Sequence, residues 1–214
     1  MTSEELEKLK ADAEAGDAWA QNKLGYFYGE EASPKDEQKA LYWYLKAAEQ
    51  GDEVAQYNVA LCYENGEGTE PDISKAVSWY EKAAVSGHVR AQYLLALCYD
   101  NGDGVEKDER KAAFWYQQAA AQGDPDAMDS LGVCYCHGTG VRKSFRKAFA
   151  LFRRAAHKGH AHAMFNWGIC YENGESVSAD LKKAIELYEK AAELGDEDAA
   201  EALERLKELR EESL

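Results

Sequence analysis

The chain has 214 residues, of which 45% are hydrophobic, and a formal net charge of −15. The apolar fraction is large enough for a core and excludes disorder of the whole chain, and the scarcity of Val, Ile and Thr argues against a large β-sheet. The 40 Asp and Glu against 25 Lys and Arg repel phosphate backbones, which argues against general nucleic-acid binding.

An internal repeat in the sequence predicts the order of the secondary-structure elements. Glycine recurs every 35 or 36 residues: Gly16, Gly51, Gly87, Gly123, Gly159 and Gly195. A Lys-Ala pair, an Ala-Ala pair and a tyrosine recur with the same period. These columns predict an N-terminal capping helix over 3–15, five repeats, and a C-terminal capping helix over 196–212. The five predicted repeats are 17–51, 52–87, 88–123, 124–159 and 160–195.

Each repeat has the pattern of two helices, as the second repeat illustrates. Its helix A begins after the N-cap residue Asp52 and ends at 65–68, where Asn and Gly favour a left-handed C-cap. Its core stripe has a spacing of four: Ala55, Val59 and Tyr63. Its helix B runs from about 73 to 86 and ends at Gly87.

A helix pair of this size cannot bury its apolar face alone, so neighbouring pairs must stack. We therefore predict an all-α solenoid of twelve helices, with residues 1–214 forming a single repeat domain. The two capping segments fit this, because each has one apolar stripe and an otherwise charged surface. These stripes are Leu6, Leu9 and Ala13 at one end, and Ala199, Leu203 and Leu206 at the other.

The fourth repeat shows a recognisable motif, Leu131-Gly132-x-x-Tyr135-x-x-Gly138-x-Gly140-Val141, followed by Lys147-Ala148. This pattern resembles the Sel1-like repeat (SLR) family, whose repeats are related to tetratricopeptide repeats. The resemblance covers nearly the whole chain, although repeat one lacks the Gly-x-Gly loop. It implies a right-handed α/α superhelix whose A helices line a concave groove, and a non-enzymatic adaptor or scaffold that works through protein–protein contact.

The face of helix A opposite its core stripe combines aromatic, charged and amide side chains, as peptide-binding surfaces do. We take it as the candidate peptide-binding groove. Its candidate residues are Asn22, Tyr57, Glu64, Arg90, Tyr93, Asp100, Asp129, Cys136, His162, Phe165 and Glu172. An adjacent apolar column is expected to pack between neighbouring A helices: Tyr26, Leu61, Leu97, Val133 and Ile169.

Four cysteines share one position of helix A: Cys62, Cys98, Cys134 and Cys170. Stacked helices lie ~8–10 Å apart, too far for one zinc ion or a disulfide to join these thiols, so we expect a core position. Cys136 falls on the open face, where a reactive exposed thiol is expected. A metal site of Cys136 and His137 with His160 or His162 is disfavoured, because helix length separates them by roughly 15 Å. We expect no metal and no cofactor.

No Ser/His/Asp or Cys/His arrangement is fixed by spacing, and the Gly-x-Gly loops follow helix ends rather than strands, so we predict that the chain is not an enzyme. The four histidines that lie close in sequence are expected to be solvated. Two alternatives stay open. One is a hydrolase resembling cysteine-rich relatives that act on cell-wall or β-lactam substrates. The other is an engineered scaffold without a natural ligand, suggested by the simple sequence of 200–209.

The stretch from Ser130 to Tyr171 contains no acidic residue but seven Lys and Arg. Helical spacing places most of these cations on the outer face of helix B of repeat four. The candidate basic surface is Arg142, Lys143, Arg146, Arg153, Arg154 and Lys158. Two interpretations remain: acids of repeats three and five neutralise these cations, or the cations dock an acidic or phosphorylated partner.

The N-terminal residues 1–5 have neither a basic start nor an apolar stretch behind them, and no run approaches the ~18 apolar residues that cross a bilayer, so we expect neither a secretory signal nor membrane contact. Five cysteines, an odd number, and the lack of an Asn-x-Ser/Thr sequon favour a reducing compartment. The expected localisation is cytoplasmic, and the expected partner of a monomeric chain is a protein or peptide.

Overall fold

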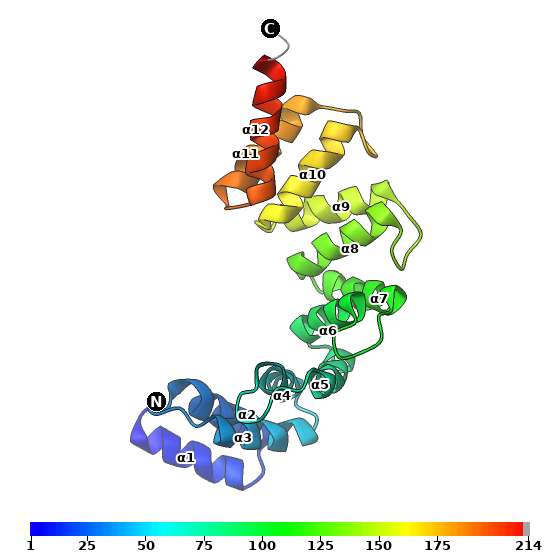
Figure 1. The fold of residues 1–214 in the computed structure, drawn as a ribbon. Coiled ribbons are helices and arrows are strands. Elements are labelled where there is room, and N and C mark those ends of the chain that lie inside the picture. The colour runs from blue at the N-terminus through cyan, green and yellow to red at the C-terminus, as the bar shows by residue number, and fades with distance from the viewer. Residues whose placement is uncertain (212–214) are drawn as a thin grey trace. The chain divides into compact units, whose positions relative to one another are not determined.

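The computed structural model describes residues 1–211, and over this range it contains twelve α-helices, one short π-helical segment and no β-strand. Residue 212, the last of the predicted C-terminal cap, lies outside the described part. The chain divides into two compact units, the first being Met1–Asp108 and the second beginning at Glu109 (Figure 1). The predicted all-α class and number of helices are confirmed.

The first unit contains the N-terminal cap, two complete helix pairs and the A helix of the third. Its elements are α1 (Ser3–Glu14), α2 (Ala18–Tyr26), the π segment η1 (Phe27–Glu31), α3 (Glu37–Glu49), α4 (Glu53–Asn65), α5 (Ile73–Val85) and α6 (Val89–Asn101). The π segment η1 occupies the place where the first repeat lacks the Gly-x-Gly loop.

The second unit contains the B helix of the third repeat, two complete pairs and the C-terminal cap. Its elements are α7 (Glu109–Ala121), α8 (Pro125–His137), α9 (Phe145–Ala156), α10 (Ala161–Asn173), α11 (Leu181–Glu193) and α12 (Glu197–Glu211). The even-numbered helices α2 to α10 are the predicted A helices, and the odd-numbered helices α3 to α11 are the predicted B helices.

Helix boundaries follow from the capping residues that the sequence supplies. The Asp52 carboxylate accepts a hydrogen bond from the Ala55 amide at 2.7 Å, which begins α4. Gly66 ends α4 with φ of 79°, a left-handed conformation that other residues rarely adopt. His88 and His160 cap α6 and α10 in the same way, each accepting through Nδ1.

Small residues let the two helices of a repeat approach closely. A Cβ added at Gly25 of α2 would lie 2.6 Å from the Tyr44 ring of α3, and one at Gly168 of α10 would lie 2.5 Å from the Tyr188 ring of α11. The large aromatic residue of the B helix therefore fills the space over a helix-A glycine. This packing explains why Gly or Ala recurs at the equivalent position of each repeat: Gly25, Ala60, Ala96, Gly132 and Gly168.

Buried glutamines join the N-terminal cap α1 and the B helices α3 and α5 to the A helix that follows each of them. The side-chain amides of Gln21, Gln56 and Gln92 donate to backbone carbonyls at 3.0, 3.3 and 3.0 Å. The acceptors, Ala13, Ala48 and Ala84, lie near the C-termini of α1, α3 and α5. These carbonyls also accept from the Gly16, Gly51 and Gly87 amides, and their second bond satisfies the buried side-chain amides of the glutamines.

Within residues 1–211, no helix is long and apolar enough to cross a membrane.

Candidate functional site

All eleven predicted groove residues lie on A helices. The first unit holds Asn22 on α2, Tyr57 and Glu64 on α4, and Arg90, Tyr93 and Asp100 on α6. The second unit holds Asp129 and Cys136 on α8, and His162, Phe165 and Glu172 on α10. We call these eleven side chains and their direct neighbours the A-helix face. The A-helix face has one part in each unit.

In the first unit, side-chain amides join neighbouring A helices. Asn58 Nδ2 on α4 donates to Asn22 Oδ1 on α2 at 3.0 Å. Asn58 is absent from the predicted site, yet it fixes the orientation of a residue that belongs to it. Because one amide holds the other, the pair presents its remaining donors and acceptors in a defined direction.

Tyr57 is half-buried and held by two aromatic neighbours. Its ring stacks on His88 at a centroid distance of 4.4 Å and lies 6.1 Å from the ring of Tyr80. Burial raises the pKa of its hydroxyl, so Tyr57 is neutral at physiological pH. On α6, the guanidinium of Arg90 lies 4.7 Å from the centre of the Tyr93 ring. The rings of Tyr57 and Tyr93 are thus fixed by their neighbours and remain partly exposed.

Two predicted acids of the A-helix face accept hydrogen bonds from buried tyrosines of the B helices. The Tyr80 hydroxyl donates to Glu64, and the Tyr188 hydroxyl donates to Glu172 Oε2 at 2.6 Å. Burial, reinforced by the carboxylate, raises the pKa of both tyrosines. Glu172 also accepts a bond from Arg205 Nη2 of α12 at 2.6 Å. These contacts orient the carboxylates before any ligand arrives.

In the second unit, a polar cluster joins α8 to α10. Asp129 accepts hydrogen bonds from Asn166 Nδ2 at 2.9 Å and from His162 Nδ1 at 2.6 Å. Asp129 is 6% exposed, whereas the open helix face was expected to leave it accessible. The neighbouring α10 covers it, so Asp129 orients His162 and Asn166. His162 Nε2 also lies 3.8 Å from a carboxylate oxygen of Asp198 on α12.

The charge of His162 follows from this cluster. The hydrogen bond and the negative charge of Asp129, helped by Asp196 and Asp198, raise the pKa of His162 against the opposing effect of burial. The imidazole is therefore more readily protonated than a free histidine. A protonated His162 donates from both ring nitrogens, which suits the carboxylates on either side.

Two cavities open beside α10. The larger, of about 510 Å³, lies between α10, α11 and α12 and is lined by Phe165, Ile169, Glu172, Tyr188 and Arg205 among others. The smaller, of about 310 Å³, lies between α8, α9 and α10 and is lined mainly by apolar side chains, including Val133, Cys136, Phe145, Phe152 and Ile169. Ile169 contributes to both. It is half-buried, as expected of the column that packs between A helices.

The cysteines are thiols rather than disulfides. The four of the column are buried as predicted, with exposed fractions of 1–6%. Cys136 differs from its prediction, because it is half-buried and burial raises the pKa of its thiol to about 11. It is therefore protonated at neutral pH and is a weak nucleophile. Among the described residues, no group of three or more His, Cys, Asp or Glu is placed to hold a metal ion.

Of the four histidines expected to be solvated, His137 and His157 are exposed, whereas His160 and His162 are half-buried and bonded to neighbouring residues. His160 Nδ1 accepts from the Ala163 amide, and His160 Nε2 lies 3.0 Å from Asp126 Oδ1. Sequence reasoning missed Asn58 and Asn166, although they occupy the same repeat position. It also missed Asp198 and Arg205, because the sequence of a capping helix does not indicate which repeat residues that helix will contact.

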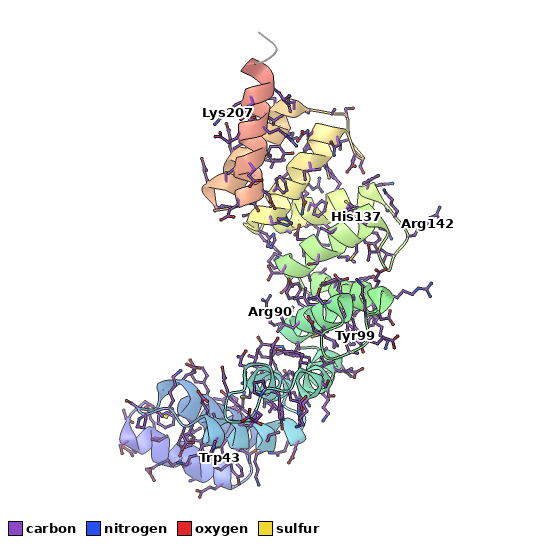
Figure 2. All side chains as sticks on the ribbon, in the orientation of Figure 1. Trp43, Arg90, Tyr99, His137, Arg142 and Lys207 are labelled. Carbon is purple, nitrogen blue, oxygen red and sulfur yellow. The ribbon has the colours of Figure 1, made fainter. Side chains whose placement is uncertain are left out.

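The six predicted basic residues are all exposed. Arg142 and Lys143 precede α9, Arg146, Arg153 and Arg154 lie on it, and Lys158 follows it. Figure 2 shows Arg142 projecting away from the ribbon at the loop between α8 and α9. The buried residues of α9, such as Ala148 and Phe152, occupy its other side.

Comparison with known proteins places the chain in a family. The Sel1 repeat model matches residues 20–52, 54–88, 89–124, 125–160 and 161–196. The c5321 protective antigen of uropathogenic Escherichia coli, which has an SLR fold, is 33% identical with a TM-score of 0.87. The alignment covers 91% of this chain and 42% of that one. This chain thus spans less than half the length of c5321.

Two further solved structures are similar over most of their own length. A Sel1 repeat protein of Oxalobacter formigenes is 33% identical with a TM-score of 0.79, over 91% of this chain and 82% of that one. A Sel1 repeat protein of Klebsiella pneumoniae described as putative is 27% identical with a TM-score of 0.53, over 94% and 98%. No curated protein sequence matches the chain. With five matched repeats and the same fold, the chain belongs to the Sel1 repeat family.

Proposed function

We propose that the chain is a non-catalytic scaffold that binds an extended segment of a partner protein along its A-helix face. Sel1 repeats are generally protein-interaction modules, which supplies the class of function. The two cavities that share Ile169 indicate where on the A-helix face the segment would bind. The smaller is mainly apolar and the larger combines apolar side chains with charged ones, so together they provide neighbouring pockets for different side chains of one peptide.

Preorganisation of the polar groups around these cavities supports the same proposal. Glu172 is held by Tyr188 and Arg205, and His162 is held by Asp129. Ligand binding then costs little ordering of these side chains, so more of the contact energy appears as affinity. Phe165 lies among them, half-buried, with its ring 5.5 Å from that of Tyr188, and provides the aromatic anchor typical of protein-binding surfaces.

The proposed setting is the cytoplasm, with the chain acting as a monomer. Support comes from the five thiols, four of which are buried in one column where no cross-link is needed for stability.

Site-specific photo-crosslinking tests the proposal. A photoreactive amino acid at position 165 should capture one partner from its host cell, and mass spectrometry should map the cross-link to a single short segment. The control carries the same group at Phe114 of α7, which is 52% exposed and lies on a B helix. Equal capture of many proteins at both positions would contradict binding at the A-helix face.

A synthetic peptide of the captured segment then gives affinities. Phe165→Ala should weaken binding by about 1–3 kcal/mol, because the anchor loses its buried contacts. The circular dichroism of the variant should match that of the wild type. A Phe165→Ala variant that binds the peptide with wild-type affinity would remove Phe165, and the cavity it lines, from the interface.

A further inference from the structure

The six exposed cations in and around α9 form a surface that meets the A-helix face only at Lys143, which lines the smaller cavity. We call Arg142, Lys143, Arg146, Arg153, Arg154 and Lys158 the basic strip. Four of the six are arginines, which favour paired hydrogen bonds to planar carboxylates.

The basic strip lacks acidic partners within its own unit. In the described part of the chain, none of the six cations forms an ion pair with a carboxylate, although α7 and α11 are available in the same unit. Lysines elsewhere behave differently: Lys39 pairs with Asp36 at 2.8 Å and Lys75 pairs with Asp72 at 3.0 Å. Direct pairing with acids of its own unit therefore does not explain the strip.

Repeat four has lost acids at positions where other repeats keep them. Arg142 stands where repeats two and three have Glu70 and Glu106, and Arg153 stands where repeats two and five have Glu81 and Glu189. At the N-cap of helix B, Asp36, Asp72 and Asp180 are replaced in repeat four by Ser144. The Ser144 hydroxyl still accepts from the Lys147 amide, at 3.4 Å, so the cap is kept while its charge is removed.

Helix stability accounts for only half of the strip. Arg153 and Arg154 lie in the last turn of α9, where the helix dipole favours cations. Arg142, Lys143 and Arg146 lie at the other end, where the dipole disfavours them, and the first turn of α9 has no acid to offset this. Three cations thus sit where folding alone would select against them.

We propose that the basic strip docks an acidic segment of a partner protein. Arg146 and Arg153 are seven residues apart on one side of α9, about 10 Å along its axis. An extended segment covers that distance in about three residues, so carboxylates two to four residues apart in one segment reach both arginines with their flexible side chains. The cations form two rows along the helix instead of converging on one point, which suits several carboxylates better than a single phosphate.

The net charge of −15 favours a short acidic segment over a long polyanion as the ligand of the strip. A long polyanion such as DNA meets repulsion from the rest of the chain, whereas a short acidic segment is attracted locally by the strip. Arg146, Arg153 and Arg154 lie on the opposite side of α9 from its buried residues. None of the four arginines of the strip lines either cavity of the A-helix face, so arginine variants test the strip separately from that face.

Fluorescence anisotropy with the full chain provides the test. The probe is a labelled peptide of about twelve residues with alternating glutamate and serine, and its control has glutamine in place of glutamate. We expect the glutamate peptide to bind at about 50 mM salt and to be released by about 500 mM, and the glutamine peptide not to bind. Absence of binding of the glutamate peptide at low salt would overturn the proposal.

Charge-reversal variants locate the binding. Arg153→Glu with Arg154→Glu should weaken it by about tenfold or more. Arg142→Glu with Arg146→Glu should weaken it similarly but leave the thermal midpoint unchanged or higher, because acids suit that end of α9. A merely structural role would lower that midpoint instead.

The matched control is Lys182→Glu with Lys190→Glu, which makes the same charge change at two exposed positions of α11. This control should bind the peptide nearly as the wild type does. Equal weakening in all three double variants would show a general charge effect and overturn the assignment to the strip. So would a single-stranded oligonucleotide that binds more tightly than the peptide and depends on the same arginines, since the ligand would then be a nucleic acid.

Discussion

His88 and His162 show how one residue type acquires opposite charge preferences in this chain. His88 stands where an aspartate caps α2, α4 and α8, and its Nδ1 must be unprotonated to accept from the Ala91 amide. Burial lowers the pKa of His88, although Glu53 and Asp52 oppose the shift. His162 instead meets the Asp129 carboxylate, which raises its pKa. The difference follows from the neighbour at each imidazole.

The His162–Asp129 pair should stabilise the folded chain most at low pH. Because the pKa of His162 is raised above 6.5 in the folded state, its contribution is fully present below pH 6.5 and is lost as the pH rises through the raised value. Titration of the His162 ring by NMR should give a pKa above 6.5 in the wild type and a lower one in Asp129→Asn. Equal values in the two proteins would show that the carboxylate does not control this histidine.

His88 should have the reverse pH dependence. Its pKa is lowered in the folded state, so its contribution to the free energy of unfolding is present above pH 6.5 and is lost as the pH falls toward the lowered value. His88→Asp introduces the aspartate cap that α2, α4 and α8 have, and it should flatten the stability profile between about pH 7.5 and 5.5, measured by urea unfolding. His88→Ala should cost about 1 kcal/mol at pH 7.5. A wild-type profile identical to that of His88→Asp would contradict this account.

Within the helix pairs of repeats two, four and five, a polar residue on helix B is matched by a polar residue at the position of helix A that it contacts, and an apolar residue by an uncharged one. In repeats two and five, a buried tyrosine of helix B has a glutamate of helix A as its acceptor, Tyr80 with Glu64 and Tyr188 with Glu172. Repeat four has Phe152 and Cys136 at these positions. With no hydroxyl to satisfy, repeat four loses its acid without leaving a buried donor unpaired. The acid-free stretch is thus compatible with a well-packed pair.

The close contact of α10 with α11 predicts an unusual sign for a helix substitution. Gly→Ala in a helix normally stabilises by about 1 kcal/mol through propensity. At Gly168 the new Cβ would lie 2.5 Å from the Tyr188 ring and 3.3 Å from the Ala184 carbonyl oxygen. We expect Gly168→Ala to lower the free energy of unfolding by about 1–3 kcal/mol, measured by urea denaturation. A stabilised variant would mean that the helix pair has room to separate.

Across the whole molecule, the repeat places four of the five cysteines at the same buried position of helix A. This burial governs the reactivity of their thiols. Burial raises the pKa of Cys62 and Cys170 to about 12, and those of Cys98 and Cys136 to about 11. The half-buried Cys136 differs from the buried column in access rather than in acidity. All of these thiols are protonated at neutral pH and are weak nucleophiles.

Thiol titration should therefore find five thiols once the chain is unfolded under non-reducing conditions. In the native state at about pH 8, all five should react slowly with an aromatic disulfide reagent, with Cys136 reacting before the buried column because it is the more accessible. The native rate should rise with pH as thiolate forms. A count of three or fewer in the unfolded chain would demonstrate disulfides and contradict the reduced state.

Local signals were sufficient for the architecture. The recurrence of Gly16, Gly51 and their successors, the aspartate caps and the stripe of Ala55 and Val59 predicted twelve helices, because each signal acts within one helix turn or one repeat. The same periodicity placed all eleven groove candidates on A helices. The exposure of the basic strip also followed from helical spacing alone.

The tertiary structure decided what each of those side chains meets. Asp129 is covered by α10, Glu172 is engaged by Tyr188 and Arg205, and Cys136 is half-buried beside Phe152, none of which spacing along one helix reveals. These contacts join residues 16 to 37 positions apart and depend on how neighbouring helices fit together. Periodicity specifies which face a residue occupies, whereas packing between helices determines whether that face stays open, because burial and pKa depend on the neighbour as much as on the residue.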